Sequence, residues 1–154
     1  MSPPTSVHHH SFVIEREFTS PPSLVFFAHA DAAAKRAWFS GPADWDRHPG
    51  EFDFRVGGRE TSTGGPPGGF VSLFDGRYMD IVPDRRIIFA FSMFVDGKLI
   101  TTSLATVEFQ PSDYGTRLLY TEQIAFLDGS DHLPQRIEGS EAMFDALEAW
   151  LGKS

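Results

Sequence analysis

The polar side chains best placed to do chemistry lie on the first and last strands that the sequence predicts. Arg16 alternates with apolar residues over residues 11–18, and Glu122 alternates with apolar residues over residues 116–126. Such alternation directs both side chains towards the core. If these strands pair, we expect Arg16 and Glu122 to form an ion pair at a cavity wall. The pair would anchor a ligand or act as an acid–base group with a shifted pKa. Alternatively it is a structural salt bridge, which is the commoner case.

Aromatic side chains supply further candidates for a binding site. Tyr78 and Tyr120 can offer hydroxyl groups to a carbonyl-bearing ligand, although core packing with one wet end is the simpler explanation. Trp38, Phe39 and Trp45 flank a Gly-Pro break, and they either line a cavity mouth or pack a helix on the sheet edge. The candidate cavity residues, of which Glu122 is also the one catalytic candidate, are Arg16, Trp38, Phe39, Tyr78, Phe91, Tyr120, Glu122, Met143 and Phe144.

The sequence shows no motif for a metal, a cofactor or an activated nucleophile. His48 and His132 lie far apart without carboxylates at metal-ligand spacing, and we interpret the histidines at 8–10 as part of a solvated tail. The glycine- and proline-rich run at 64–69 lacks the pattern of a phosphate-binding loop, so we interpret it as a mobile loop. The absence of cysteine excludes disulfides and thiolate–zinc sites. We therefore expect no metal and no cofactor.

The composition excludes several classes of partner. The chain has 154 residues, with 13 Lys and Arg residues against 21 Asp and Glu residues and a net charge of −8. This charge repels phosphate groups, so we expect neither nucleic acid nor an anionic membrane as a partner. No apolar run is long enough to span a bilayer, and the N-terminus has no signal-peptide pattern. We expect a single cytoplasmic domain, either monomeric or homodimeric.

The elements that must position the candidate residues follow from periodicity and from Gly and Pro breaks. Residues 1–10 are expected to form a flexible tail. A long amphipathic helix ends the chain, with Ser140 and Phe144 on its apolar face, and Arg136 and Glu138 near its start are interpreted as solvated charges. Two short helices are predicted at 24–30 and 31–39, and strands at 11–18, 51–56, 59–63, 70–82, 86–95, 99–110 and 116–126.

This order of elements predicts an α+β fold in which about six to seven antiparallel strands form a strongly curved sheet. The chain contains 15 Phe residues, and a sheet that carries so many cannot face water on both sides. We therefore expect the long helix to lie across the concave face. A curved sheet that grips one helix tends to leave a cavity between them, and binding cavities are mostly apolar with a few polar groups.

Several short sequences, taken in order, are similar to those of a known family. They are IEREF at 14–18, Pro at 21–22, Val-Phe at 25–26, AKRAWF at 34–39, DFRVGG at 53–58, DIVP at 80–83, GTRL at 115–118, TEQ at 121–123, Gly139 and Ala-Leu at 146–147. Through them, residues 11–151 resemble the heat-shock-protein-90 ATPase activator homologue family. That family lies within the START-like, or helix-grip, superfamily of polyketide cyclases and birch-pollen-allergen proteins. The resemblance implies a stand-alone bacterial member with one START-like domain at 11–154.

The residues and the resemblance together leave three hypotheses for function. The first is a protein that holds a small hydrophobic molecule, favoured by the inward-facing Phe residues and the lack of a catalytic motif. The second is a chaperone-binding module with a role in the stress response, as the co-chaperone members of the family imply. The third is a cyclase or hydrolase that uses Glu122, Arg16 and a tyrosine. Fold likeness alone does not choose among them.

Overall fold

The computed structural model describes residues 6–39 and 41–152 of the chain. Within them, one strand is followed by two short helices, six further strands and a long C-terminal helix. The elements are β1 (Val7–Phe18), α1 (Pro22–Ala30), α2 (Ala32–Trp38), β2 (Asp46–Phe52), β3 (Arg59–Gly65), β4 (Ser72–Val82), β5 (Arg86–Val95), β6 (Lys98–Pro111), β7 (Thr116–Leu127) and α3 (Leu133–Gly152).

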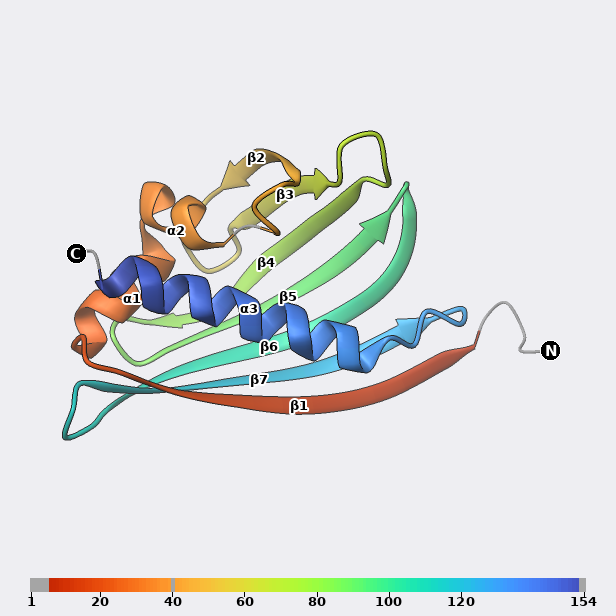
Figure 1. The fold of residues 1–154 in the computed structure, drawn as a ribbon. Helices are drawn as coiled ribbons and strands as arrows, with labels where there is room; N and C mark the ends of the chain where they lie inside the picture. The colour runs from red at the N-terminus through yellow and green to blue at the C-terminus, as the bar shows by residue number, and fades with distance from the viewer. Residues whose placement is uncertain (1–5, 40, 153–154) are drawn as a thin grey trace.

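The strands of the described residues form one antiparallel sheet in the order β1-β7-β6-β5-β4-β3-β2. The first and last strands are neighbours, as the sequence predicted, with Phe12 opposite Glu122 and Arg16 opposite Leu118. The sheet curves strongly, α3 lies along its concave side, and α1 and α2 stand at one end (Figure 1). The predicted α+β helix-grip architecture is therefore confirmed, with seven strands.

Strand β7 shows how alternation builds the core. Its residues Leu118, Tyr120, Ile124 and Phe126 point inward and are at most 4% exposed, and Glu122 falls in the same row at 1%. Burying the apolar members of this row removes their surface from water, which is the main favourable term in folding. The helix covers the row with one face, as predicted, and the buried residues of α3 are Ser140, Phe144, Leu147 and Leu151.

The two short helices are joined at a single residue, Asp31. Its side chain accepts a hydrogen bond from the Ala34 backbone N–H at 3.0 Å and so caps the N-terminus of α2. At the other end of α2, Trp38 is 2% exposed, and its indole N–H donates to the Ala28 carbonyl at 2.8 Å. This bond satisfies a buried indole and holds α1 and α2 in one fixed arrangement.

Strand β1 begins earlier than the sequence predicted. The expected tail covered residues 1–10, but β1 starts at Val7, and residues 7–10 pair with the end of β7. Residues 1–5 of that tail lie outside the described residues. The pattern missed this start because His8, His9 and His10 are polar on both faces of the strand and are exposed or half-buried, so no alternation marks them.

The region between α2 and β4 departs furthest from the predicted boundaries. Strand β2 is Asp46–Phe52 rather than 51–56, because the chain turns after Asp53. Gly57 has φ +84°, and a Cβ on Gly58 would lie 2.0 Å from the Asp53 carbonyl oxygen, so the predicted Gly-Gly turn is confirmed. Two glycines of the expected loop at 64–69 instead end β3, and β4 begins at Ser72 rather than at residue 70.

Candidate functional site

A cavity of about 1080 Å³ lies between α3, α2 and the inner face of the sheet. This volume is slightly above the range of about 300–1,000 Å³ that is usual for small-molecule sites. The predicted candidates that line it are Trp38, Phe39, Phe91, Tyr120, Glu122, Met143 and Phe144. Arg16 and Tyr78 do not line it. The candidates that line the cavity thus include most of the predicted rings and the carboxylate of Glu122.

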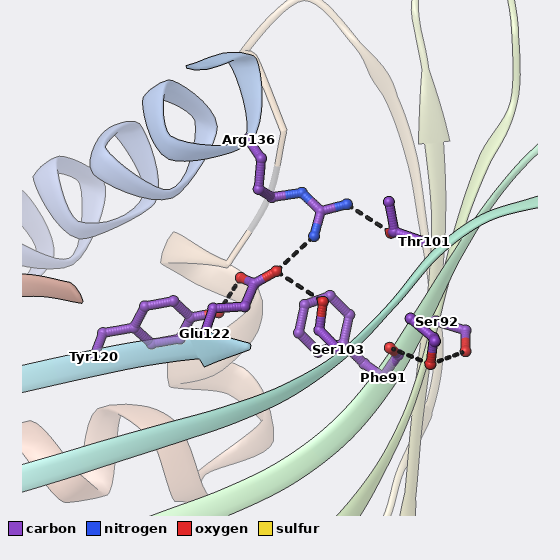
Figure 2. A network of polar contacts seen from close by, with 8 residues as sticks. Phe91, Ser92, Thr101, Ser103, Tyr120, Glu122 and Arg136 are labelled. Atoms are coloured by element: carbon purple, nitrogen blue, oxygen red, sulfur yellow. Dashed lines mark hydrogen bonds and ion pairs between the residues drawn. The ribbon is translucent and has the colours of Figure 1, made fainter. Parts of the chain in front are cut away.

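Glu122 lies at the centre of a buried hydrogen-bond cluster (Figure 2). Its carboxylate accepts hydrogen bonds from the Tyr120 hydroxyl at 2.7 Å and from the Ser103 hydroxyl at 2.8 Å. Arg136, in the first turn of α3, donates to the same carboxylate at 2.7 Å and to the Thr101 hydroxyl at 2.7 Å. Both carboxylate oxygens are thus hydrogen-bonded, and the guanidinium balances a charge that would be costly to bury alone.

The predicted ion pair between Arg16 and Glu122 is wrong. Arg16 forms ion pairs with two carboxylates of α3 instead, Glu141 at 2.9 Å and Asp145 at 3.0 Å. The cause is the strand register: Glu122 stands opposite Phe12, which is about 13 Å along β1 from Arg16. The Arg16 contacts fasten α3 to the edge strand and lie outside the cavity.

A second buried carboxylate, Glu60 on β3, lies across the cavity from Glu122. Lys35 of α2 donates to Glu60 Oε1 at 3.0 Å, and the Tyr78 hydroxyl donates to the same oxygen. The side chains of Lys35 and Glu60 are 7% and 9% exposed, so this pair is enclosed. Glu60 Oε2 accepts no hydrogen bond from the described residues. Both residues of the pair line the cavity, and Tyr78 supports Glu60 from behind.

Aromatic rings surround the ammonium group of Lys35. Its Nζ lies 4.3 Å from the centroid of the Phe39 ring and 5.9 Å from the rings of Trp38, Phe52 and Phe89. The faces of such rings carry partial negative charge and attract a cation, most strongly where water is excluded. The Lys35 charge is therefore held by one carboxylate and by the ring faces.

Burial and the neighbouring carboxylates shift the pKa values of the groups in these clusters. Burial, and then the charge of Glu122, raise the pKa of Tyr120 well above its usual value, and burial with Glu60 does the same for Tyr78. Both hydroxyls therefore stay protonated and act as donors. Burial and the nearby charge of Lys35 lower the pKa of His29 to about 3, so this imidazole is neutral.

Comparison of the sequence with protein-family models identifies one family. The model described as Activator of Hsp90 ATPase homolog 1-like protein matches residues 19–152. The chain belongs to this family. The match runs from α1 to the end of α3 and so includes every residue of the two buried clusters. A search of curated proteins gives no match.

Solved structures of similar proteins share the fold of this family member. A protein from Rhizobium leguminosarum is 38% identical, with 97% of this chain and 98% of that chain covered and a TM-score of 0.90. The Mll3558 protein from Rhizobium loti is 43% identical, with coverages of 94% and 99% and a TM-score of 0.86. An AHSA1-like protein from Aeromonas hydrophila, 21% identical, covers 94% and 93% at a TM-score of 0.73, which shows the fold alone.

Sequence reasoning missed three charged residues of the two buried clusters in this family member: Lys35, Glu60 and Arg136. Arg136 was expected to be solvated beside Glu138, but it points inward to Glu122. The spacing could have revealed this: Arg136 precedes the cavity candidate Met143 by seven residues, so both lie on the same face of the helix, two turns apart. Lys35 likewise precedes the cavity candidate Trp38 by three residues, which places both on the same face of α2. Glu60 gave no signal, since β3 carries polar residues on both faces.

Two features are absent from the described residues: a cluster of metal-ligating side chains and a membrane-spanning helix. They contain no group of three or more His, Asp or Glu side chains that is placed to hold a metal ion. None of the helices in the same part of the chain is long and apolar enough to cross a membrane.

Proposed function

We propose that the chain binds a small hydrophobic molecule in the cavity between α3 and the sheet. The observation that carries this proposal is the cavity of about 1080 Å³, whose wall is built mainly from aromatic and aliphatic side chains. A large apolar surface that water can reach commonly marks a ligand-binding groove or an interaction site. A few polar groups in an otherwise apolar wall are typical of sites that both hold and orient a ligand.

Two methionines provide a matched test of this proposal. Met143 of α3 lines the cavity, whereas Met79 of β4 is 55% exposed and does not line it. Met143→Trp should fill part of the cavity, while Met79→Trp adds the same atoms to the outer surface. We expect N-phenyl-1-naphthylamine to bind the wild type with enhanced fluorescence, and Met143→Trp to weaken its Kd by about tenfold or more. Met79→Trp should leave the Kd unchanged.

Either of two outcomes would contradict the proposal. The probe would fail to bind the folded wild type, or both tryptophan variants would bind it as the wild type does. Native mass spectrometry of the purified protein gives an independent measurement. An excess mass that is lost on denaturation would identify a bound molecule directly, and its fragmentation would give its chemical class.

A further inference from the structure

The Glu122–Arg136 cluster and the Lys35–Glu60 cluster lie on opposite sides of two phenylalanine rings of β5. On one row, Glu122 of β7 is opposite Ala105 of β6, which is opposite Phe89 of β5. On the next row of the same face, Glu60 of β3 is opposite Gly76 of β4, and Gly76 is opposite Phe91 of β5. The two rows thus meet on β5, where the rings of Phe89 and Phe91 have centroids 5.5 Å apart.

This register fixes the shape of the space between the clusters. Glu60 and Glu122 are separated by four strand spacings, which is about 19 Å measured along the sheet. Because the sheet is concave, the direct span across the cavity is shorter than this arc (Figure 1). On these two rows the rings of Phe89 and Phe91 form the middle of the span, between Gly76 of β4 and Ala105 of β6. An elongated, flat molecule lying on Phe89 and Phe91 would reach from one cluster to the other.

The cluster at Glu122 offers a ligand mainly hydrogen-bond donors, because both carboxylate oxygens already accept hydrogen bonds from the protein. Glu122 Oε1 already accepts from Tyr120, and Oε2 accepts from Ser103 and Arg136. A guanidinium has five N–H donors. Arg136 uses one towards Glu122 and one towards Thr101, so three remain. Since Glu122 balances the charge of Arg136, the group that best fits here is a neutral acceptor, such as a carbonyl oxygen.

The cluster at Glu60 offers a donor and an acceptor together. Lys35 uses one of its three N–H donors on Glu60 Oε1, and Glu60 Oε2 accepts no hydrogen bond from the described residues. A hydroxyl group both donates and accepts, so it can satisfy Glu60 Oε2 and Lys35 at once. The pair is neutral in sum, and both side chains are less than 10% exposed, which disfavours a charged ligand group here.

We infer that the cavity takes an elongated, uncharged and largely aromatic molecule, with a hydroxyl group at the Lys35–Glu60 end and a carbonyl group at the Arg136 end. This inference rests on the proposed function, because it names the class of ligand for the same cavity. It adds three properties that binding of a hydrophobic molecule does not require: length, neutrality and a fixed direction.

A set of stilbenes tests these properties. The probes are 4-acetyl-4′-hydroxystilbene, the two analogues that lack either the acetyl or the hydroxyl group, unsubstituted stilbene, and the analogue with a carboxylate in place of the acetyl group. In fluorescence titrations of the wild type we expect each polar group to tighten binding about tenfold, as a hydrogen bond to a charged partner does. The carboxylate analogue should bind more weakly than the acetyl compound.

Variants at each end test the direction. Lys35→Met with Glu60→Gln removes one charge pair as a unit, so that no single charge is left buried. In this double variant the hydroxyl group should no longer strengthen binding, while the acetyl group still does. Arg136→Met should show the reverse. Arg16→Gln, at an ion pair outside the cavity, is the matched control and should behave as the wild type.

If the double variant does not fold, the wild type still gives the direction by NMR. Nuclear Overhauser contacts should join the phenol ring of the probe to Phe39 and Phe52, which surround Lys35, and the acetyl end to Phe91, which lies 5.8 Å from the Arg136 guanidinium. The reverse contacts, or polar groups that add no affinity, would overturn this inference alone, provided that stilbene binds. If no probe binds, including unsubstituted stilbene, the proposed function fails as well.

Discussion

Glu60 and Glu122 are buried on the same concave face and are bound in similar ways, yet their surroundings differ. Each accepts a hydrogen bond from a tyrosine hydroxyl and pairs with one cation from a helix. Glu122 has a third donor, Ser103, and its cation is 18% exposed. Glu60 has only two donors on one oxygen, and its cation is 7% exposed beneath aromatic rings.

Each carboxylate joins a helix to the sheet, but the two leave different hydrogen-bonding groups available. At Glu122 both carboxylate oxygens accept hydrogen bonds, and water can reach part of the guanidinium, so the cluster joins α3 to the sheet while keeping donors free. At Glu60 the carboxylate depends on one cation, whose ammonium group lies among aromatic rings, so the pair fastens α2 to β3 and leaves one oxygen open. Loss of a partner should therefore matter more at Glu60 than at Glu122.

Removing the cation at each end should give the largest effects. Lys35→Met leaves Glu60, a carboxylate that is 9% exposed, with only the Tyr78 hydroxyl as a donor, and we expect a loss of about 3–5 kcal/mol in the free energy of unfolding. Arg136→Met leaves Glu122 with two donors, and we expect about 1–3 kcal/mol. Urea denaturation at pH 7.5 measures both. Equal losses, or a larger loss for Arg136→Met, would refute the comparison.

Acidification should lower the free energy of unfolding through His29, which lies near Lys35. His29 has a pKa lowered from 6.5 to about 3 by burial and by the charge of Lys35. Its folded form resists protonation, so its contribution is complete above the unfolded pKa and declines as pH falls below it. Between pH 7.5 and pH 5 we expect a loss of about 2 kcal/mol in unfolding free energy.

The variant His29→Phe provides the control for this pH dependence. It keeps an aromatic ring against Trp38 and Phe109, which His29 contacts at centroid distances of 4.8 and 5.2 Å. We expect its unfolding free energy to change less between pH 7.5 and pH 5 than that of the wild type. The same slope in both proteins would mean that another group titrates.

The two tyrosine hydroxyls give a smaller contrast. Tyr78→Phe removes one of the two donors of Glu60, whereas Tyr120→Phe removes one of the three donors of Glu122. We expect losses of about 2 and about 1 kcal/mol in unfolding free energy, since a hydrogen bond to a charged group contributes roughly 1.5–3 kcal/mol when nothing replaces it. Thermal unfolding of the two single variants measures the order, and the opposite order would show that Glu60 is the better satisfied carboxylate.

The Arg16 ion pairs should matter least. Their partners Glu141 and Asp145 have side chains that are 46% and 71% exposed, and exposed ion pairs contribute about 0–1 kcal/mol. We expect Arg16→Gln to lower the unfolding free energy by less than about 1 kcal/mol and to leave probe binding unchanged. A larger loss would mean that contacts between β1 and α3 rival the buried clusters in importance.

Strand boundaries were predictable where turn residues and the alternation of apolar and polar residues mark the same limits. The sequence predicted β5 at 86–95, and the structure places it at Arg86–Val95, because turn residues flank it on both sides. Asp84 before it and Asp96 after it have φ values of 63° and 49°, a conformation that Asp tolerates better than most residues. The boundaries failed around β2 and β3, where polar residues occupy both faces and no period marks the inward side.

The candidate site was predictable only in its apolar part. Hydrophobic periodicity identifies which strand and helix faces turn inward, and this was enough to find Glu122 and most of the rings. The partner of a buried charge depends on register and on the angle of a helix, which one sequence does not determine. Arg16 and Arg136 show this: both point inward, but only the register decides which of them meets Glu122.

The pairing of the first strand with the last also constrains how the molecule folds. Strand β1 pairs with β7, so that Glu15 and Arg117, 102 residues apart in the sequence, meet in an ion pair. Contacts of such high sequence separation require a large loop closure and favour folding in milliseconds to seconds rather than microseconds. During synthesis, β1 leaves the ribosome long before β7, its one partner among the described strands, is made. The unpaired β1 strand is therefore a potential site of aggregation until β7 has also left the ribosome.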